Sequence, residues 1–190
     1  MPRERTSRTV RVSYRKAIES DLGTLIDHRH RMWTEIGNNT EPEISEHDPR
    51  YRKWAKTRLG SGELVGVIAE TSGGSVVASG CVWYRPDQPR PQIPGLISPY
   101  ILSMYTSPDW RGRGIAPRIV RELVAACRQA GYPNVELHAS RFGRRVYRRA
   151  GFERTWEMRF WIDPKIRRRR ARLRAKASRR RARKGLDRGR

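Results

Sequence analysis

The stretch MYTSPDWRGRGIAPR, residues 104–118, decides how this sequence is interpreted. A β-type run ends in a turn at Ser107 and Pro108, two glycines follow at 112 and 114, and Pro117 stands where a helix begins. The unpaired N–H groups of a first helical turn attract an anion, and glycines let the backbone approach it closely. A proline in that turn gives up only an N–H group that has no helical partner. The stretch therefore predicts a phosphate-binding loop between a strand and a helix.

Two other phosphate loops do not fit this stretch. The sequence RGRGIA lacks the GxxxxGK[ST] pattern of a nucleoside triphosphatase. It also comes late in the chain, with no further βαβ unit to build a dinucleotide-binding fold. A tight turn that only packs a helix on a strand stays open as the plainer interpretation.

The elements around this loop follow from periodicity and from turn residues. They are a strand over 10–17, helices over 22–37 and 49–60, strands over 64–71, 75–84 and 100–106, a helix over 117–130, a strand over 135–140, a helix over 143–150 and a strand over 152–162. Residues 38–46 and the proline-rich segment 85–99 are expected to be loops. This order predicts one α/β domain over residues 1–163, a mixed central sheet flanked by helices.

Charge separates the last part of the chain from the rest. The 190 residues carry a formal net charge of +23, and residues 164–190 hold 15 of the 42 Lys and Arg but one acid. This Arg-rich tail has too few apolar residues for a core, so we expect it to be disordered or helical. A positive field of this size attracts nucleic acid, ribosomal surface or anionic lipid, although a solvated tail without a fixed partner is an equal alternative.

Several classes of protein are disfavoured by composition. No run of 18 apolar residues occurs, so no membrane span is predicted. The N-terminus lacks the apolar segment of a secretory signal, and the expected location is cytoplasmic. Cys81 and Cys127 lie in apolar contexts and are expected to be buried free thiols. Four scattered histidines predict no metal site.

The loop resembles the RxxGxG/A signature of the GNAT superfamily of acyl-coenzyme A dependent N-acetyltransferases, with Arg111, Gly114 and Ala116 at the matching positions. The stretch LHASRFGRRVYRRAGF, residues 137–152, is similar to the family's short helix with a tyrosine that closes on Gly-Phe. The segment HRHRMWTEIG, residues 28–37, looks like its first-helix segment on the acceptor side. The resemblance covers residues 10–162 and implies the GNAT fold, with acetyl-CoA as acyl donor, an amine as acceptor and no metal.

The resemblance also implies where the coenzyme binds. The loop would hold the pyrophosphate through Arg111, Gly112, Arg113, Gly114, Ile115 and Ala116. In the family the preceding strand splays from its neighbour at a bulge and offers backbone groups to the pantetheine arm and the acetyl group. By position these groups belong to Met104, Tyr105 and Thr106, and Ser140 would add a further coenzyme contact.

Catalytic roles follow from the same resemblance and from side-chain chemistry. Tyr147 stands where the family places the acid that protonates the leaving thiolate, although a core tyrosine is the alternative. Glu136 and His138 share one face of the strand over 135–140 and are candidates for taking the amine proton. Further candidates are His28, His30 and Glu35. A water chain without a single base would also serve.

The acceptor is left open by the sequence, because loops without a readable code set it. A small-molecule, peptide or tRNA-linked amine is compatible with the chemistry, and residues 165–190 could bring a nucleic acid or ribosome into reach. The alternatives are an aminoacyl-tRNA acetylating toxin and a GNAT-fold module that binds nucleic acid or ribosome with little catalysis. The oligomeric state, monomer or homodimer, is open as well.

Overall fold

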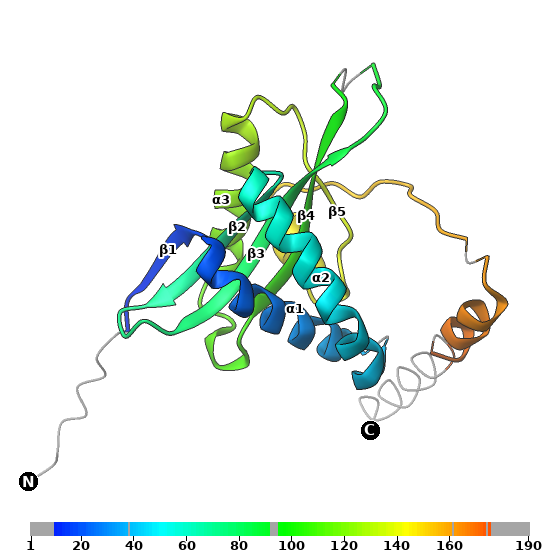
Figure 1. Ribbon diagram of the computed structural model, residues 1–190. Helices are drawn as coiled ribbons and strands as arrows, with labels where there is room; N and C mark the ends of the chain where they lie inside the picture. The colour runs from blue at the N-terminus through cyan, green and yellow to red at the C-terminus, as the bar shows by residue number, and fades with distance from the viewer. Residues whose placement is uncertain (1–9, 38, 92–94, 161, 174, 176–190) are drawn as a thin grey trace, which may run out of the picture. The chain divides into compact units, whose positions relative to one another are not determined.

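A computed structural model describes residues 10–37, 39–91, 95–160, 162–173 and 175 (Figure 1). The chain divides into two units, Met1–Phe152 and Glu153–Arg190. The domain boundary expected at residue 163 stays a prediction. Within the described part of the chain, no helix is both long and apolar enough to cross a membrane.

The first unit is built on one mixed sheet of five strands in the order β1-β2-β3-β4-β5. The strands are β1 (Val12–Lys16), β2 (Leu64–Thr71), β3 (Val76–Pro86), β4 (Ile97–Thr106) and β5 (Glu136–Leu137). Neighbours run antiparallel except β4 and β5, which are parallel. Hairpins can join the first pairs, whereas the parallel pair needs a helical crossover. Helix α3 (Ile115–Gln129) supplies it, and the predicted mixed sheet is confirmed.

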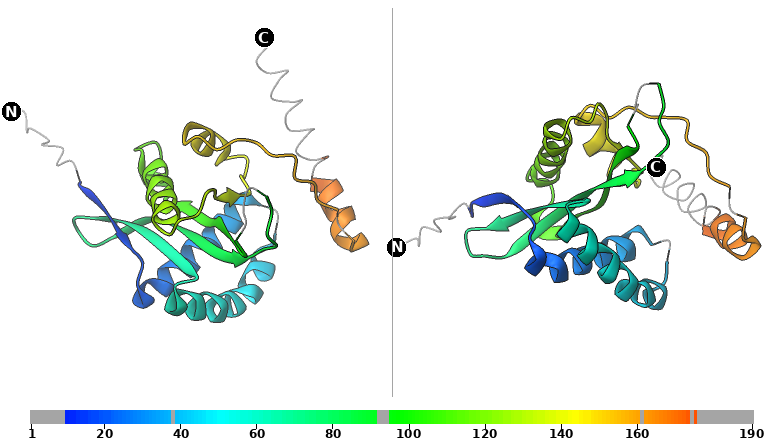
Figure 2. Two further views of the ribbon diagram at one scale, coloured as in Figure 1. Left: turned by 90° about the horizontal axis from the view of Figure 1, so that it is seen from above. Right: turned by 45° about the horizontal axis from the view of Figure 1, so that its top comes forward.

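Helices cover both faces of this sheet (Figure 2). Helices α1 (Leu22–Ile36) and α2 (Glu41–Ser61) pack on one face, where Leu25, Ala55 and Ile68 form part of a buried cluster. Helix α3 packs on the other face through Ile119 and Leu123. The short helix α4 (Arg144–Arg149) packs against α3. The sheet is thus buried on both sides, which the near-continuous apolar runs of β2 and β3 require.

The prediction of a loop over residues 38–46 is wrong, because α2 begins at Glu41. The Glu43 carboxylate accepts hydrogen bonds from the Thr40 backbone N–H at 2.7 Å and from the Thr40 hydroxyl at 2.9 Å. The bond from the Thr40 N–H satisfies a backbone donor at the helix start and forms one half of a capping box. The helix then continues through Pro49 to Ser61. The polar composition of the segment concealed a helix start.

The loop expected over residues 85–99 is also shorter than predicted. Strand β3 continues to Pro86 and β4 starts at Ile97, so the buried Pro99 lies inside a strand and pairs with Tyr84. A proline cannot donate to a ladder and needs a position where no neighbour requires its N–H. Pairing of β4 with β5 begins only at Tyr100, one residue later. The described part of the loop is therefore confined to residues 87–91 and 95–96.

Two strands predicted near the C-terminal end of the sheet differ in the structure. The strand expected over 135–140 is reduced to Glu136–Leu137. The described residues of 152–162 form no strand, although their apolar residues alternate as in one. Cys81 and Cys127 are both free and buried, as expected.

The second unit contains a helix over residues 164–173. It begins where the Asp163 carboxylate accepts the backbone N–H of Lys165 at 2.7 Å. Pro164 occupies the first helical position, where its missing N–H costs nothing. Local capping and good helix formers order this part of the tail, although it has no core.

A three-residue clasp joins α1 to α2 and should make stability depend on pH. His30 lies 2.6 Å from Asp48 and 2.5 Å from Glu41, and these hydrogen bonds raise its pKa above 6.5. Because the folded pKa is the higher one, the clasp stabilises fully below about pH 6.5 and its contribution is lost as pH rises through the raised value. His30→Gln should therefore cost up to about 1 kcal/mol at pH 6 and less at higher pH. Urea unfolding of both proteins from pH 6 to pH 9 measures this, and a cost independent of pH would contradict it.

Candidate active site

The geometry of the site starts from one extra residue in β4. Cys81 pairs with Leu102 but Ser79 pairs with Tyr105, so the register shifts by one between them. Ser103 takes a φ of 53°, in the left-handed region that L-residues other than glycine rarely adopt. A bulge of this kind bends the strand and leaves a residue unpaired. The Tyr51 hydroxyl of α2 lies 3.4 Å from the Ser103 hydroxyl at this point.

A missing side chain on β3 makes room for the bulge. A Cβ placed on Gly80 would lie 2.1 Å from the Met104 Sδ atom and 3.0 Å from the Ile119 Cγ2 atom. Both distances are below ordinary van der Waals contact, so the Met104 side chain occupies the space that a larger residue at position 80 would need. Glycine is therefore built into the sheet opposite the bulge.

Strands β4 and β5 are paired over two residues and then separate. Tyr100 pairs with Glu136 and Ile101 with Leu137, and in the described structure no further β5 residue pairs with β4. The predicted coenzyme contacts Met104, Tyr105 and Thr106 lie beyond this point. Backbone groups on that edge have no strand partner there, which makes them available to an extended ligand.

The loop RGRGIA follows β4 and leads into α3. Gly112 and Gly114 have φ values of 79° and 77°, so both need the left-handed conformation that glycine adopts freely. Gly114 is the residue before the helix, and no side chain caps that end. The uncapped first turn and the helix dipole make this end a place for an anion. Ile115 is buried and anchors the turn on the sheet.

Arg111, the first residue of the loop signature, is held by two partners although its side chain is 46% exposed. Its Nη2 atom lies 2.6 and 2.7 Å from the two Glu35 oxygens, and its Nε donates to the Thr106 carbonyl at 2.9 Å. Glu35, a candidate base in the sequence, is thus an ion-pair partner that ties the last turn of α1 to the loop. The sequence does not predict this ion pair, because Glu35 and Arg111 lie 76 positions apart in the chain.

Tyr147 lies half-buried on α4 with its ring folded back on Gly143. A Cβ at Gly143 would lie 2.6 Å from the Tyr147 Cε2 atom, and the ring meets Phe152 edge-on at 5.8 Å. Burial, with a smaller contribution from Tyr100, raises the pKa of Tyr147 to about 12. The phenol is therefore protonated throughout the neutral range.

His138 and Glu136 differ in their surroundings. His138 Nδ1 is hydrogen-bonded to the Tyr100 hydroxyl, and their rings are 5.6 Å apart. Glu136 accepts from Arg85 at 2.7 Å and from Arg90 at 3.2 Å, so guanidinium groups occupy both of its oxygens. Tyr100 thus contacts His138 and also contributes to the raised pKa of Tyr147, and the pairing of β4 with β5 sets its position beside Glu136.

The remaining candidates have structural partners. The Ser140 hydroxyl accepts the Gly143 N–H at 3.2 Å and shapes the turn before α4. His28 is buried against Ser79 at 2.9 Å and Tyr105, and burial lowers its pKa to about 4. His30 belongs to the clasp between α1 and α2. Among the described residues no group of His, Cys, Asp and Glu is arranged to hold a metal ion.

Comparisons with known proteins agree with this geometry. The model of the acetyltransferase (GNAT) family matches residues 25–152. A GCN5-related N-acetyltransferase from Ralstonia eutropha JMP134 is similar at 28% identity, 80% of this chain, 99% of that chain and a TM-score of 0.75. A predicted acetyltransferase from Clostridium acetobutylicum, solved with acetyl-CoA, is similar at 30% identity, 80% of this chain, 96% of that chain and a TM-score of 0.73. Glucosamine-6-phosphate N-acetyltransferase from Arabidopsis thaliana shares the fold at 19% identity, 80% and 99% coverage and a TM-score of 0.59. No curated protein matches the sequence.

The site combines a strand with a bulge, a parallel neighbour that separates from it and an uncapped helix start, and the family match identifies this arrangement as an acyl-coenzyme A binding fold. The chain belongs to the GNAT family of acetyltransferases. It is an N-acetyltransferase that uses acetyl-CoA as its donor substrate.

The loop prediction can be tested by charge alone. Gly114→Asp and Gly114→Asn both place a side chain of one shape at a left-handed position that Asp and Asn tolerate. Only the aspartate adds a negative charge where the pyrophosphate is expected, so its coenzyme A affinity should be at least about tenfold weaker than that of the asparagine variant. Calorimetry measures both dissociation constants. Equal affinities would place the pyrophosphate elsewhere.

Proposed function

We propose that the enzyme acetylates a primary amine carried by an RNA- or ribosome-associated acceptor. The observation that supports the transfer chemistry is the placement of three parts along β4: the bulge at Ser103, the loop over 111–116 that follows the strand, and Tyr147, whose pKa is raised in part by Tyr100. The strong basicity of the chain supports the class of acceptor. A tRNA- or ribosome-linked acceptor also implies a cytoplasmic site of action.

The donor would lie along the free edge of β4. Backbone groups of Met104, Tyr105 and Thr106 would hold the pantetheine arm and the acetyl carbonyl, and the loop would hold the pyrophosphate. Arg111 would act on the coenzyme through loop position, since Glu35 and Thr106 already engage its guanidinium. Ser140 would support the coenzyme side through the turn that it shapes before α4.

The reaction then needs a base and an acid. The amine nitrogen bonds to the thioester carbon, the C–S bond breaks with its electron pair on sulfur, and the surplus amine proton leaves through His138 to water. Tyr147 protonates the thiolate and is reprotonated from solvent, so the net result moves one proton from amine to thiol. We assign the base to His138 because its Tyr100 contact orients the ring, whereas Glu136 is held by Arg85 and Arg90.

Burial suits Tyr147 for the role of acid. Its raised pKa keeps the proton on the phenol at every neutral pH, which a donor requires. The same poorly solvated surroundings disfavour a thiolate formed beside it and raise its affinity for the proton. The transfer therefore depends on burial of both partners and not on solution pKa values alone.

An acetyl-transfer screen tests the acceptor class. Small amines, peptides with free N-termini and aminoacyl-tRNAs are supplied with acetyl-CoA, and release of the coenzyme thiol is followed. Acceptors linked to RNA should show a higher kcat/KM than the same amine without RNA. Equal kcat/KM for the free and the RNA-linked amine would remove RNA from the proposal and leave the acetyltransferase intact.

Tyr147→Phe tests the acid directly. The ring and its Phe152 contact remain and only the hydroxyl is lost, so kcat should fall by about 10²-fold with little change in the KM for acetyl-CoA. Because the pKa of Tyr147 is about 12, the wild type should show no loss of kcat from this group up to about pH 11. A folded Phe variant with kcat within about twofold of the wild type would identify Tyr147 as a core residue.

Gly143→Ala is a second, independent test, because it changes the position of the Tyr147 ring and keeps its hydroxyl. The added Cβ forces the Tyr147 ring from its position, so kcat should fall while coenzyme affinity persists. Gly23→Ala is the matched control, because a Cβ at that helical position meets nothing within 4 Å. Steady-state kinetics of both variants should separate them, and equal kcat values would show that the ring position does not matter.

A further inference from the structure

The unit Glu153–Arg190 exposes large apolar side chains that the acetyltransferase site does not use. Trp156 is 90% exposed, Met158 94%, Phe160 76% and Ile162 86%. They occupy every second position over 156–162, and residues two apart lie on the same side wherever the chain is extended. Arg154 lies over the Trp156 ring at 5.7 Å. Exposed apolar groups gathered in this way mark an interaction surface.

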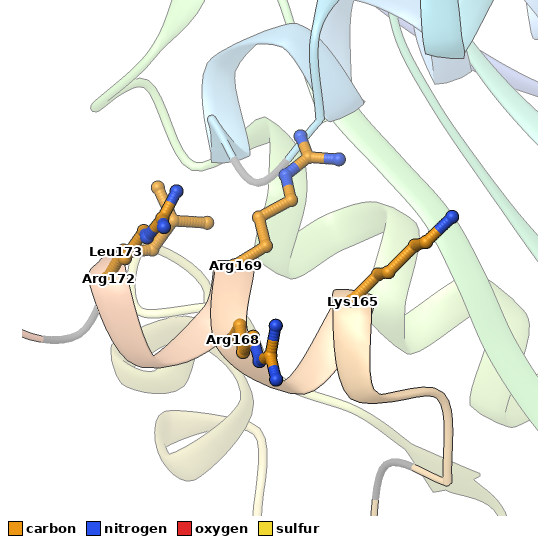
Figure 3. Close-up of a pocket in the computed structure, with 5 residues that line it drawn as sticks. All are labelled: Lys165, Arg168, Arg169, Arg172 and Leu173. Carbon is orange, nitrogen blue, oxygen red and sulfur yellow. The ribbon is translucent and has the colours of Figure 1, made fainter.

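A basic helical face follows directly in the chain. Lys165, Arg168, Arg169 and Arg172 recur at spacings of three and four, which places them on one side of the helix over 164–173. With Leu173 they line one pocket (Figure 3). Lys165, Arg168 and Arg172 have no acidic partner in the described part of the unit. Their charge is therefore available to an external anion.

We propose that this unit binds single-stranded RNA, with Trp156 and Phe160 stacking on bases and the basic face contacting phosphates. Aromatic side chains beside a cationic surface are the means by which proteins hold unpaired nucleic acid without reading its sequence. The inference rests on the RNA-associated part of the proposed function. It names the docking surface and the form of the nucleic acid.

Other partners fit the same residues less well. An amphipathic helix in a membrane surface needs a broad apolar face, but Ile166 and Leu173 are the only large apolar residues of 164–173. A second copy of the chain would bring two strongly basic tails together, since residues 164–190 hold 15 basic residues and one acid. Base-paired duplex offers phosphates but no free base faces for Trp156 and Phe160.

The two parts of the surface should respond differently to salt. Phosphate contacts release counterions and weaken binding by about 0.7 log unit per contact for each decade of salt, whereas stacking releases none. Changing the aromatic residues should therefore lower affinity at every salt concentration without changing the slope. Changing the basic face should flatten the slope.

The experiment measures fluorescence anisotropy of a labelled, unstructured 12-nucleotide RNA with the full-length protein, without acetyl-CoA, over a range of salt. Trp156→Leu keeps an apolar side chain but removes the aromatic face, and Trp156→Phe keeps a ring. We expect the leucine variant to bind about tenfold more weakly with an unchanged slope, and the phenylalanine variant to retain most of the affinity.

The matched pair for the helix keeps or removes charge. The triple variant Lys165→Gln, Arg168→Gln and Arg172→Gln should lower the slope by about 2 log units per decade, at about 0.7 for each contact. The double variant Arg168→Lys and Arg172→Lys should retain the slope. Circular dichroism checks that each variant is folded, and exposed positions of this kind tolerate substitution.

Several results would overturn the inference. They are equal affinity for the RNA annealed to its complement, wild-type affinity of the Trp156→Leu variant, an unchanged slope in the triple variant, or binding to vesicles of anionic lipid without binding to RNA. Concentration-dependent self-association that requires Trp156 would equally replace RNA by a second copy. A failure to acetylate RNA-linked amines would leave this binding measurement unaffected, so the two proposals can fail separately.

Discussion

The geometry of the site depends on the bulge in strand β4. One extra residue in β4 turns Ser103 into a left-handed conformation, and such a residue costs about 1–3 kcal/mol unless its surroundings hold it. The surroundings are Gly80 on β3, which leaves room for Met104, and Tyr51 on α2, which meets the Ser103 hydroxyl. Beyond the bulge the edge of β4 no longer has β5 as a partner. Backbone groups on that edge are therefore available to a ligand that needs backbone hydrogen bonds.

The bulge also explains why the loop and α4 lie where they do. Strand β4 ends at Thr106, whose carbonyl accepts from Arg111 and so fixes the path of the chain into the loop. The parallel β5 returns beside Tyr100 and then separates from β4. The chain that leaves β5 forms α4, which carries Tyr147. The positions of Tyr147, the loop and the strand edge are thus consequences of one topology, in which a crossover helix joins two parallel strands that separate.

Local signals predicted the parts of the fold that local physics determines. The glycines of RGRGIA and the apolar stripe of α3 were sufficient for the loop and its helix, and β2 and β3 agree with their predicted ranges to within two residues. One error was local, because the capping residues Thr40 and Glu43 at the start of α2 were not recognised. The other errors arose where a long-range partner decides the outcome. Pro99 is tolerated in β4 because β5 starts one residue later, and the alternating residues 152–162 form no strand although their period is correct. Tyr100 and the Glu35–Arg111 ion pair needed the sheet register and the docking of α1, which no spacing in the sequence contains.

Two glycines, Gly80 and Gly143, matter to this enzyme because they have no Cβ. At 80 and at 143 the absence of a Cβ leaves the volume that Met104 and Tyr147 occupy. An alanine scan removes atoms at most positions of a protein, but at a glycine it adds one, and at positions 80 and 143 the added Cβ would lie less than 3.0 Å from another side chain. A description of the site that names only side chains in contact would omit both glycines. We therefore expect the site to tolerate substitution least at positions 80 and 143, where glycine leaves the space that a neighbouring side chain fills.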